Sequence, residues 1–317
     1  MFDFEKQAVN ESFMQMLDDP SFLKEAQEKG AEYLALQIYE DSFMQRIFPG
    51  RPISPAVCDR DVNSPNLRVV IDKEFRDVKA TTYTMRGRGE YDYVETDRYA
   101  IEFFKIESDE YEITEGELRG IRQPLQNLIR NQVAYHIKKQ MDRIFIGMCE
   151  AAVADTGQVL DLSAVPGASP AITIETLTRL FNLIDDSSAA GRSGQYLQSK
   201  TLLMTKAQTN NINTWVQANT DGAVFNGIGT EYWRDGFKYD QLFGRRVVAT
   251  VKDDLVPSNV IWLFTDHSML GHHFHFNDDR FSIEKKFDRM VWKGWRTFGA
   301  AIGNNAGVAK LILPTNS

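Results

Sequence analysis

The residues best suited to chemistry in this sequence are histidines. Three of the five lie in one short stretch, which reads Gly271-His272-His273-Phe274-His275-Phe276. Alternate side chains of a β-strand point to the same side, so His273 and His275 would lie together, as two metal ligands must. A zinc site needs at least a third protein ligand, and no other segment offers an identifiable one. We therefore favour imidazoles at a subunit contact or in solvent, and keep a metal-dependent enzyme as the minor alternative.

Other catalytic signatures are missing from the chain. The sequence contains no phosphate-binding G-x-x-x-x-G-K-[ST], no nucleophile elbow G-x-S-x-G and no zinc motif H-E-x-x-H. Cys58 and Cys149 have no evident neighbouring base, and Cys149 falls near the apolar side of a predicted helix, which favours a buried, inert thiol. We therefore predict no catalytic residue, no cofactor and no metal ligand, and the chain is not expected to be an enzyme.

The clearest structural pattern is a long amphipathic helix. Apolar residues recur at steps of three and four, with one step of five, from Leu125 to Ala152. Pro124 suits the first turn, where its missing N–H needs no partner. This spacing predicts a helix of about 30 residues. Gly157 and the Pro166-Gly167 region are expected to close it.

A long hairpin is predicted before this helix. Apolar and polar residues alternate within 67–85 and 92–114, as is typical of β-strands. Between these arms, the glycines of Arg86-Gly87-Arg88-Gly89-Glu90 suit a tight reversal. An isolated two-stranded hairpin is marginally stable in water. It therefore needs another surface to lie on, and a neighbouring subunit is the expected one.

The remaining segments predict an arm and a mixed α/β region. Residues 1–45 are interpreted as helical arm segments, and three prolines within 49–55 require extended chain that can travel far from any core. Thr173 is a predicted helix cap, and Thr205 with Gln208 forms a capping box. Core strands are predicted from the apolar runs at 200–204, 247–251, 260–264 and 308–313.

Composition and charge limit the classes of protein. The 317 residues include 43% hydrophobic and 25% charged side chains, which is ordinary for a globular protein and excludes a collagenous or wholly disordered chain. No apolar stretch approaches the roughly 20 residues of a spanning helix, and the N-terminus lacks an export signal. With a net charge of −8, the chain is a poor candidate for sequence-specific binding of nucleic acid.

Charge is nevertheless segregated along the chain. Residues 1–50 hold ten acids against four bases, whereas residues 280–310 hold seven bases against two acids. Segregation of this kind lets acidic and basic surfaces of neighbouring copies attract one another. Solvated faces are the alternative explanation.

Several stretches are similar to one known family. They are Asp41-Ser42-Phe43-Met44-Gln45-Arg46-Ile47-Phe48-Pro49, Phe103-Phe104-Lys105-Ile106-Glu107-Ser108-Asp109-Glu110-Tyr111-Glu112, Leu203-Met204-Thr205 with the helix to Trp215, Leu242-Phe243-Gly244-Arg245-Arg246-Val247-Val248, and Asn304-Asn305-Ala306-Gly307-Val308-Ala309-Lys310-Leu311. With these stretches, the order of arm, extension, hairpin, long helix, α/β domain and strand-rich return resembles the major capsid proteins of tailed bacteriophages, which have the HK97-like fold. The resemblance covers nearly the whole chain.

The resemblance implies an α+β, HK97-like capsid fold with four parts. They are an N-terminal arm (1–60), an E-loop hairpin (61–118), a peripheral domain with a spine helix (119–169 and 271–317) and a mixed α/β axial domain (170–270).

The resemblance also implies which side chains meet other molecules. Contacts with a neighbouring subunit are expected from Arg86, Gly87, Arg88, Gly89 and Glu90 at the E-loop tip, and from Phe43, Arg46, Ile47 and Phe48 in the arm. Candidates for facing DNA, through electrostatic contacts that are insensitive to sequence, are Arg130, Lys138 and Lys139.

The expected function is that of a major capsid protein. Copies of the chain would form hexamers and pentamers of an icosahedral shell around double-stranded DNA, in a virion assembled in the host bacterial cytoplasm. Expected partners are portal, scaffolding and decoration proteins and non-specifically bound DNA, with no membrane and no cofactor. Because the arm begins at Met1, a separate scaffolding protein, or none, is implied. The alternatives are an encapsulin-type nanocompartment shell and the metal-dependent enzyme using His273 and His275.

Overall fold

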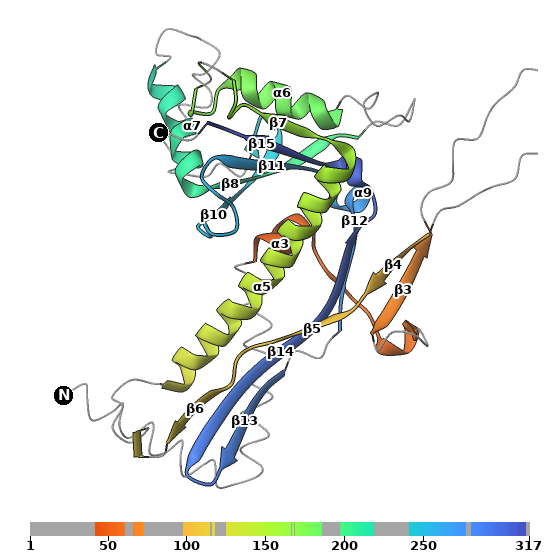
Figure 1. Ribbon diagram of the computed structural model, residues 1–317, viewed down its shortest axis with the longest axis vertical. Coiled ribbons are helices and arrows are strands. Elements are labelled where there is room, and N and C mark those ends of the chain that lie inside the picture. Colours follow the sequence, from red (N-terminus) through yellow and green to blue (C-terminus); the bar gives the residue numbers. More distant parts are fainter. Residues whose placement is uncertain are drawn as a thin grey trace, which may run out of the picture.

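In the computed structural model, two six-stranded sheets pack along one long helix, and a three-stranded sheet projects beside them (Figure 1). The residues that the structure describes are 42–60, 66–72, 98–114, 116–117, 125–165, 167, 169–185, 197–218, 241–276 and 280–314. The predicted arm segments before residue 42 and the hairpin tip at 86–90 lie outside them. None of the described helices is long and apolar enough to span a bilayer.

Helix α5 (Leu125–Thr156) runs through the middle of the molecule. Its 32 residues extend about 48 Å at a rise of about 1.5 Å per residue. Gly157 ends the helix with φ +71°, a conformation that a residue without Cβ adopts freely. The predicted long helix and its end at Gly157 are confirmed. Its buried stripe consists of Ile129, Val133, Ala134, Ile137, Lys138, Met141, Asp142, Phe145, Cys149, Ala152 and Val153.

The first sheet is built around the long strand β14 (Arg289–Ile302). Strands β12 (Gly271–His275) and β13 (Arg280–Lys286) pair along one side of it, and β5 (Phe104–Glu107) and β6 (Tyr111–Thr114) pair along the other, all antiparallel. Trp295 marks the two sides, because it lies opposite Arg280 on one and Glu107 on the other. β1 (Arg51–Pro52) adds to β12 in parallel.

The second sheet has the strand order β7-β15-β11-β8-β10-β9. Its strands are β7 (Val159–Asp161), β8 (Ser199–Thr205), β9 (Gln241–Leu242), β10 (Arg245–Thr250), β11 (Val260–Thr265) and β15 (Val308–Ile312). Helices α6 (Ile174–Asp185) and α7 (Lys206–Ala218) accompany it. The predicted core strands are therefore confirmed as β8, β10, β11 and β15.

The two faces of the second sheet pack against different helices. All six residues of β11 are buried, and they alternate between two hydrophobic clusters. Ile261 and Leu263 belong to the cluster under α6, whereas Trp262 and Phe264 belong to the cluster that contains α5. That second cluster also includes residues of the first sheet, so α5 joins the cores of both sheets.

The third sheet corrects the predicted hairpin. β3 (Leu67–Asp72) pairs with β4 (Arg98–Glu102) in antiparallel register, with β2 (Asp59–Arg60) on the outer side of β3. The second arm does not continue to residue 114. Beyond residue 103 the chain joins β14 as β5 and β6, where Ile106 is buried and Glu107 pairs with Lys293 at 3.0 Å.

Local capping signals predicted two helix starts correctly. The amide of Thr176 donates to the hydroxyl of Thr173 at 3.2 Å, ahead of α6. At α7, the amide of Thr205 donates to the side-chain oxygen of Gln208 (2.9 Å) and the amide of Gln208 to the hydroxyl of Thr205 (3.4 Å). Shorter elements are α3 (Phe43–Ile47), η1 (Pro55–Val57), α9 (His267–Leu270) and η3 (Asn305–Gly307).

Strand pairing also changes the expected domain boundaries. The family division placed 119–169 and 271–317 together, apart from 170–270. β7 and β15 fall in the former segments but pair with each other and, through β11, with the second sheet. The reason is burial: Leu311 is fully buried in the cluster beneath α6. These two strands therefore belong with 170–270, and the rest of the division stays a prediction.

Phe145 gives a direct test of the shared core. Its fully buried ring lies 5.5 Å from Phe264 of the second sheet and 6.5 Å from Phe43 of α3, measured between ring centroids. We expect Phe145→Ala to lower the free energy of unfolding by about 3–5 kcal/mol, measured by chemical denaturation, because the cavity lies between several segments. Tyr135→Ala, at an exposed site on the same helix, is the control. Equal losses in both variants would contradict this packing.

Candidate functional site

The predicted histidine cluster is a structural contact of β12. The side chain of His273 is 2% exposed, and its Nδ1 lies 2.9 Å from the carbonyl oxygen of Phe48. A carbonyl only accepts, so Nδ1 carries the proton. Burial lowers the pKa of His273 to about 4, with the nearby charge of Arg296 acting in the same direction. His273 is therefore neutral at pH 7 and holds the chain that follows α3.

His273 and His275 lie on one side of the strand, as predicted, with ring centroids 6.3 Å apart. Gly50 fills the space beside them, since a Cβ there would come within 2.9 Å of ring atoms of both imidazoles. Among the described residues, no group of three or more His, Cys, Asp or Glu side chains could hold a metal ion. His272 bonds elsewhere, with Nδ1 2.6 Å from the Tyr99 hydroxyl.

The cysteines follow the sequence interpretation. Cys149 is fully buried, and burial raises its pKa well above the ordinary thiol value, so the reactive thiolate is suppressed. The pKa of Cys58 is also raised by burial, and its thiol lies 3.8 Å from the carbonyl oxygen of Ser54. Neither group is activated as a nucleophile.

A buried carboxylate holds the arm against α5. Asp142 Oδ1 accepts hydrogen bonds from the Ser42 hydroxyl at 2.7 Å and the Met44 amide at 3.0 Å, and Oδ2 accepts from Lys252 Nζ at 2.5 Å. The side chain of Asp142 is completely buried, and that of Lys252 is nearly so. Burial raises the pKa of Asp142, and the Lys252 charge opposes this shift. We call Ser42, Asp142 and Lys252 the arm clamp.

Burial of the arm side chains contradicts three of the four predicted arm contacts with a neighbouring subunit. Phe43, Ile47 and Phe48 are each less than 5% exposed in the protomer's own core, so these side chains are not available to a neighbouring subunit. The rings of Phe43 and Phe48 pack on Phe145 of the same chain. Arg46 is exposed, and its proposed contact stays a prediction.

The chain after the arm clamp is also held by its own protomer. The amide of Ile53 donates to the carbonyl of His275 at 3.0 Å, continuing the pairing of β1 with β12. The proline-rich stretch is extended, as predicted, but up to Ile53 it stays on its own protomer, paired with β12. It becomes an edge strand, where a proline is tolerated because no ladder donor is required of it.

The candidates for facing DNA separate into two groups. Lys138 is 2% exposed, so it cannot face DNA, and that prediction is wrong. It falls on the buried stripe of α5, four residues after Ala134 and three before Met141. Lys139 forms an ion pair with Asp254 at 2.7 Å, and the guanidinium of Arg130 lies 5.6 Å from the centre of the Phe281 ring. Both remain candidates.

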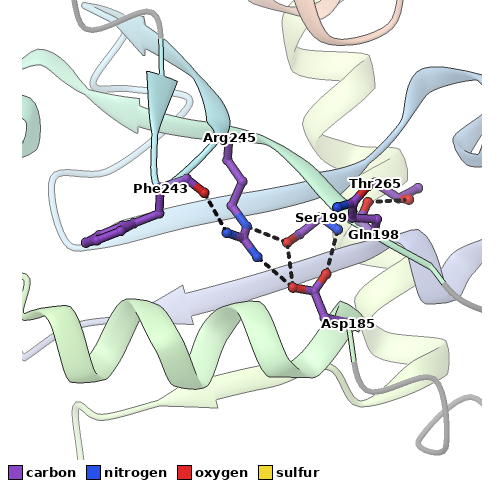
Figure 2. Close-up of polar contacts among 6 residues, drawn as sticks. All are labelled: Asp185, Gln198, Ser199, Phe243, Arg245 and Thr265. Carbon is purple, nitrogen blue, oxygen red and sulfur yellow. Dashed lines mark hydrogen bonds and ion pairs between the residues drawn. The ribbon is translucent and has the colours of Figure 1, made fainter.

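A second polar cluster, missed from the sequence, lies at the edge of the second sheet (Figure 2). Arg245 donates from Nε to the Ser199 hydroxyl (2.6 Å), from Nη2 to Asp185 (2.6 Å) and from Nη1 to the Phe243 carbonyl (2.8 Å). Its guanidinium also lies 3.8 Å from the centre of the Phe181 ring. Asp185 in turn accepts the amide of Ser199 at 2.7 Å.

This cluster, Asp185–Ser199–Arg245, links separate elements of the fold. The Ser199 hydroxyl donates to Asp185 and accepts from Arg245, so both of its hydrogen-bonding roles are used within the cluster. Asp185 ends α6, Ser199 begins β8 and Arg245 begins β10. One guanidinium thus joins the ends of three elements.

Comparisons with known proteins agree on the fold. No family model matches the chain, and no curated protein does. Solved structures do match, at low identity. The capsid of Ralstonia phage GP4 aligns with TM-score 0.59 and 10% identity over 88% of this chain and 92% of that one. The capsid structure of the cyanophage P-SCSP1u aligns with TM-score 0.57 and 11% identity over 87% and 89%.

A third solved structure is a virus-like particle from Pyrococcus furiosus. It aligns with TM-score 0.51 and 13% identity over 90% of this chain and 98% of that one. All three alignments cover nearly the full length of both chains, so the likeness is one of whole architecture. The chain has the α+β fold of these shell proteins, as the sequence resemblance implied.

The arm clamp gives a prediction about stability. Asp142→Ala leaves the Lys252 ammonium buried without its carboxylate, and we expect it to lower the free energy of unfolding by about 3–5 kcal/mol. The double variant Asp142→Leu/Lys252→Met should recover most of this loss, since no charge is then buried. Chemical denaturation measures both. A double variant as unstable as the single one would contradict the paired-charge explanation.

His273 gives a prediction about pH. Its pKa in the folded protein is about 4 against about 6.5 when unfolded, so the unfolded chain binds more protons between these values. Stability is therefore full above about pH 6.5 and falls as pH drops toward 4, by about 3 kcal/mol in total.

The matched control is His273→Gln, which keeps a polar side chain but does not titrate. Unfolding free energies of both proteins would be measured from pH 7 to 4, and their difference isolates His273 from the neighbouring charges of Arg296 and His275. Parallel pH profiles would show that His273 does not carry this dependence.

Proposed function

We propose that the chain is the major capsid protein of a tailed bacteriophage, which forms hexamers and pentamers of an icosahedral shell around double-stranded DNA. The observation that carries the proposal is the match of nearly the whole chain to nearly the whole of capsid proteins, with 88% and 92% coverage for the Ralstonia phage capsid. A shell subunit acts through its whole surface, so agreement over full length is more informative than a local motif.

The third sheet supports assembly through neighbouring copies. Of the residues in β3 and β4, Ile101 alone is buried. Leu67, Val69 and Ile71 are only partly covered, and Val70 is 41% exposed. A thin sheet of this kind gains stability when a second surface covers it. In a shell, an adjacent subunit supplies that surface.

The finer assignments belong to this proposal. β3 and β4 form the stem of the E-loop, and Arg86, Gly87, Arg88, Gly89 and Glu90 are its subunit-contacting tip. Arg46 contacts a neighbour from the arm, and Arg130 and Lys139 of α5 face DNA. α5 is the spine of the peripheral domain, and the second sheet with α6 and α7 is the axial domain.

The biological setting follows from the same proposal. The role is structural and not enzymatic, the protein belongs to the virion capsid, and it assembles in the host bacterial cytoplasm. Portal, scaffolding and decoration proteins complete the particle. Contact with packaged DNA is electrostatic and independent of base sequence.

An encapsulin-type nanocompartment is the second candidate. The alignment that covers 98% of the virus-like particle from Pyrococcus furiosus favours keeping it. The two functions differ in what the particle contains, which is DNA for a phage head and protein for a nanocompartment. A metal-dependent enzyme has less support, because the buried His273 already uses Nδ1 to hold Phe48.

Assembly is the decisive experiment. We expect the expressed chain, with its scaffolding protein where one is needed, to form closed shells in negative-stain micrographs. Deleting 82–96 should leave folded subunits that form no shells, because the stem pairing of Asp72 with Arg98 is retained while the subunit-contacting tip is lost. Circular dichroism verifies folding. A wild-type chain that stays monomeric at every concentration would contradict the capsid function, and shells from the deletion variant would contradict the use of the tip.

A further inference from the structure

The turn between β13 and β14 exposes an aromatic ring completely. Lys286 pairs with Arg289, so Phe287 and Asp288 form a two-residue hairpin loop. The side chain of Phe287 is 99% exposed, the largest exposure among the large hydrophobic residues of the described chain. In Figure 1 this turn lies at the bottom end of β13 and β14, far from the second sheet.

The backbone at this turn is unfavourable for phenylalanine. Phe287 has φ +55°, whereas Asp288 is not among the residues with positive φ. A two-residue hairpin with positive φ at its first central position normally has glycine there. A bulky residue in this region is strained, and such strain tends to persist where a function requires the side chain.

Phe243 provides an internal comparison. It also has positive φ, at +51°, in the turn between β9 and β10. Its ring, however, packs edge-on against Phe181, with the centroids 6.4 Å apart, and it is 41% exposed. Phe243 therefore has a packing partner within its own protomer, and the packing offsets its backbone strain. Phe287 gains no such burial.

We propose that Phe287 is an interface anchor that inserts into an apolar pocket on a second copy of this chain. This inference rests on the proposed function, since it requires that copies assemble. Exposed charged residues flank Phe287 in the sequence, which matches the usual arrangement of an aromatic anchor within a polar rim. These are Glu284, Lys285, Lys286, Asp288 and Arg289.

Charge favours a second copy as the occupant. Between Arg280 and Lys293 the chain holds five bases and two acids, whereas the whole chain has a net charge of −8. The neighbouring strands add acids to this surface, since Arg289 pairs with Glu112 and Lys293 with Glu107 and Glu110. Charges of both signs therefore lie around the tip, and a second copy that presents the same set of charges can complement them.

The first test separates folding from assembly. Phe287→Asn removes the ring but suits positive φ, so its melting temperature should equal or exceed that of the wild type. The concentration at which shells form should rise at least tenfold, measured by light scattering and negative-stain microscopy. Phe287→Trp keeps an aromatic anchor and should assemble at no more than a threefold higher concentration.

Val251→Asn is the matched control. Val251 is an apolar residue that is 74% exposed, on a different segment, and its replacement should leave assembly unchanged. Normal assembly of Phe287→Asn would overturn the anchor while leaving the capsid function intact. A wild-type chain that never assembles would overturn both. An equal defect in Val251→Asn would overturn the specific role of Phe287.

The second test identifies the occupant. A photoreactive benzoyl-phenylalanine placed at position 287 should cross-link two copies of the chain in assembled shells and not in dissociated subunits. Mass spectrometry of the product would locate the pocket. Cross-links to DNA or to a different protein, without chain-to-chain products, would overturn the assignment of a second copy.

Discussion

The arrangement of the protomer depends on one buried carboxylate. Asp142 lies on the stripe of α5 that faces the core, where an uncompensated charge would be strongly destabilising. It is satisfied from two directions, by Ser42 and Met44 of the arm and by Lys252 after β10. Because both oxygens are occupied, the position of the arm and that of the second sheet are set relative to the same turn of α5. The arm clamp thereby sets the positions at which Phe43 and Phe48 pack in the core. The chain after them continues as β1, which pairs with β12.

Helix α5 packs against two sheets because its buried stripe extends from Ile129 to Val153. Residues near Ile129 and Val133 share a cluster with Phe281, Met290 and Trp292 of the first sheet, and Phe145 contacts Phe264 of the second. A displacement of one sheet along the helix would therefore open cavities against the other. This coupling joins the two six-stranded sheets, whereas the third sheet has little burial of its own and contacts the first sheet through Tyr99 and His272.

Local signals in the sequence predicted elements well, and long-range pairings poorly. The spacing of α5 and the capping residues Thr173 and Thr205 act over a few residues, so they could be recognised without the fold. Spacing also held a signal that was overlooked: Lys138 and Asp142 both fall on the apolar stripe, which indicates burial and not a solvent- or DNA-facing side. The partner of Asp142 lies 110 residues away at Lys252, and no local pattern connects them. Likewise, the departure of β5 and β6 to β14 depends on a strand almost two hundred residues later.

The two exposed turns differ in whether packing within the protomer offsets their backbone strain. At the second sheet, Arg245 donates hydrogen bonds to Asp185, Ser199 and the carbonyl of Phe243. The ring of Phe243 itself packs against that of Phe181. Strain at that turn is offset inside one chain. At the first sheet, β13 and β14 pair without help from Phe287, since their register is complete from Arg280 to Lys286. The ring contributes nothing to that pairing, while its backbone conformation carries a cost, so the protomer alone gives no reason for an aromatic residue there. A reason exists once a second molecule covers the ring.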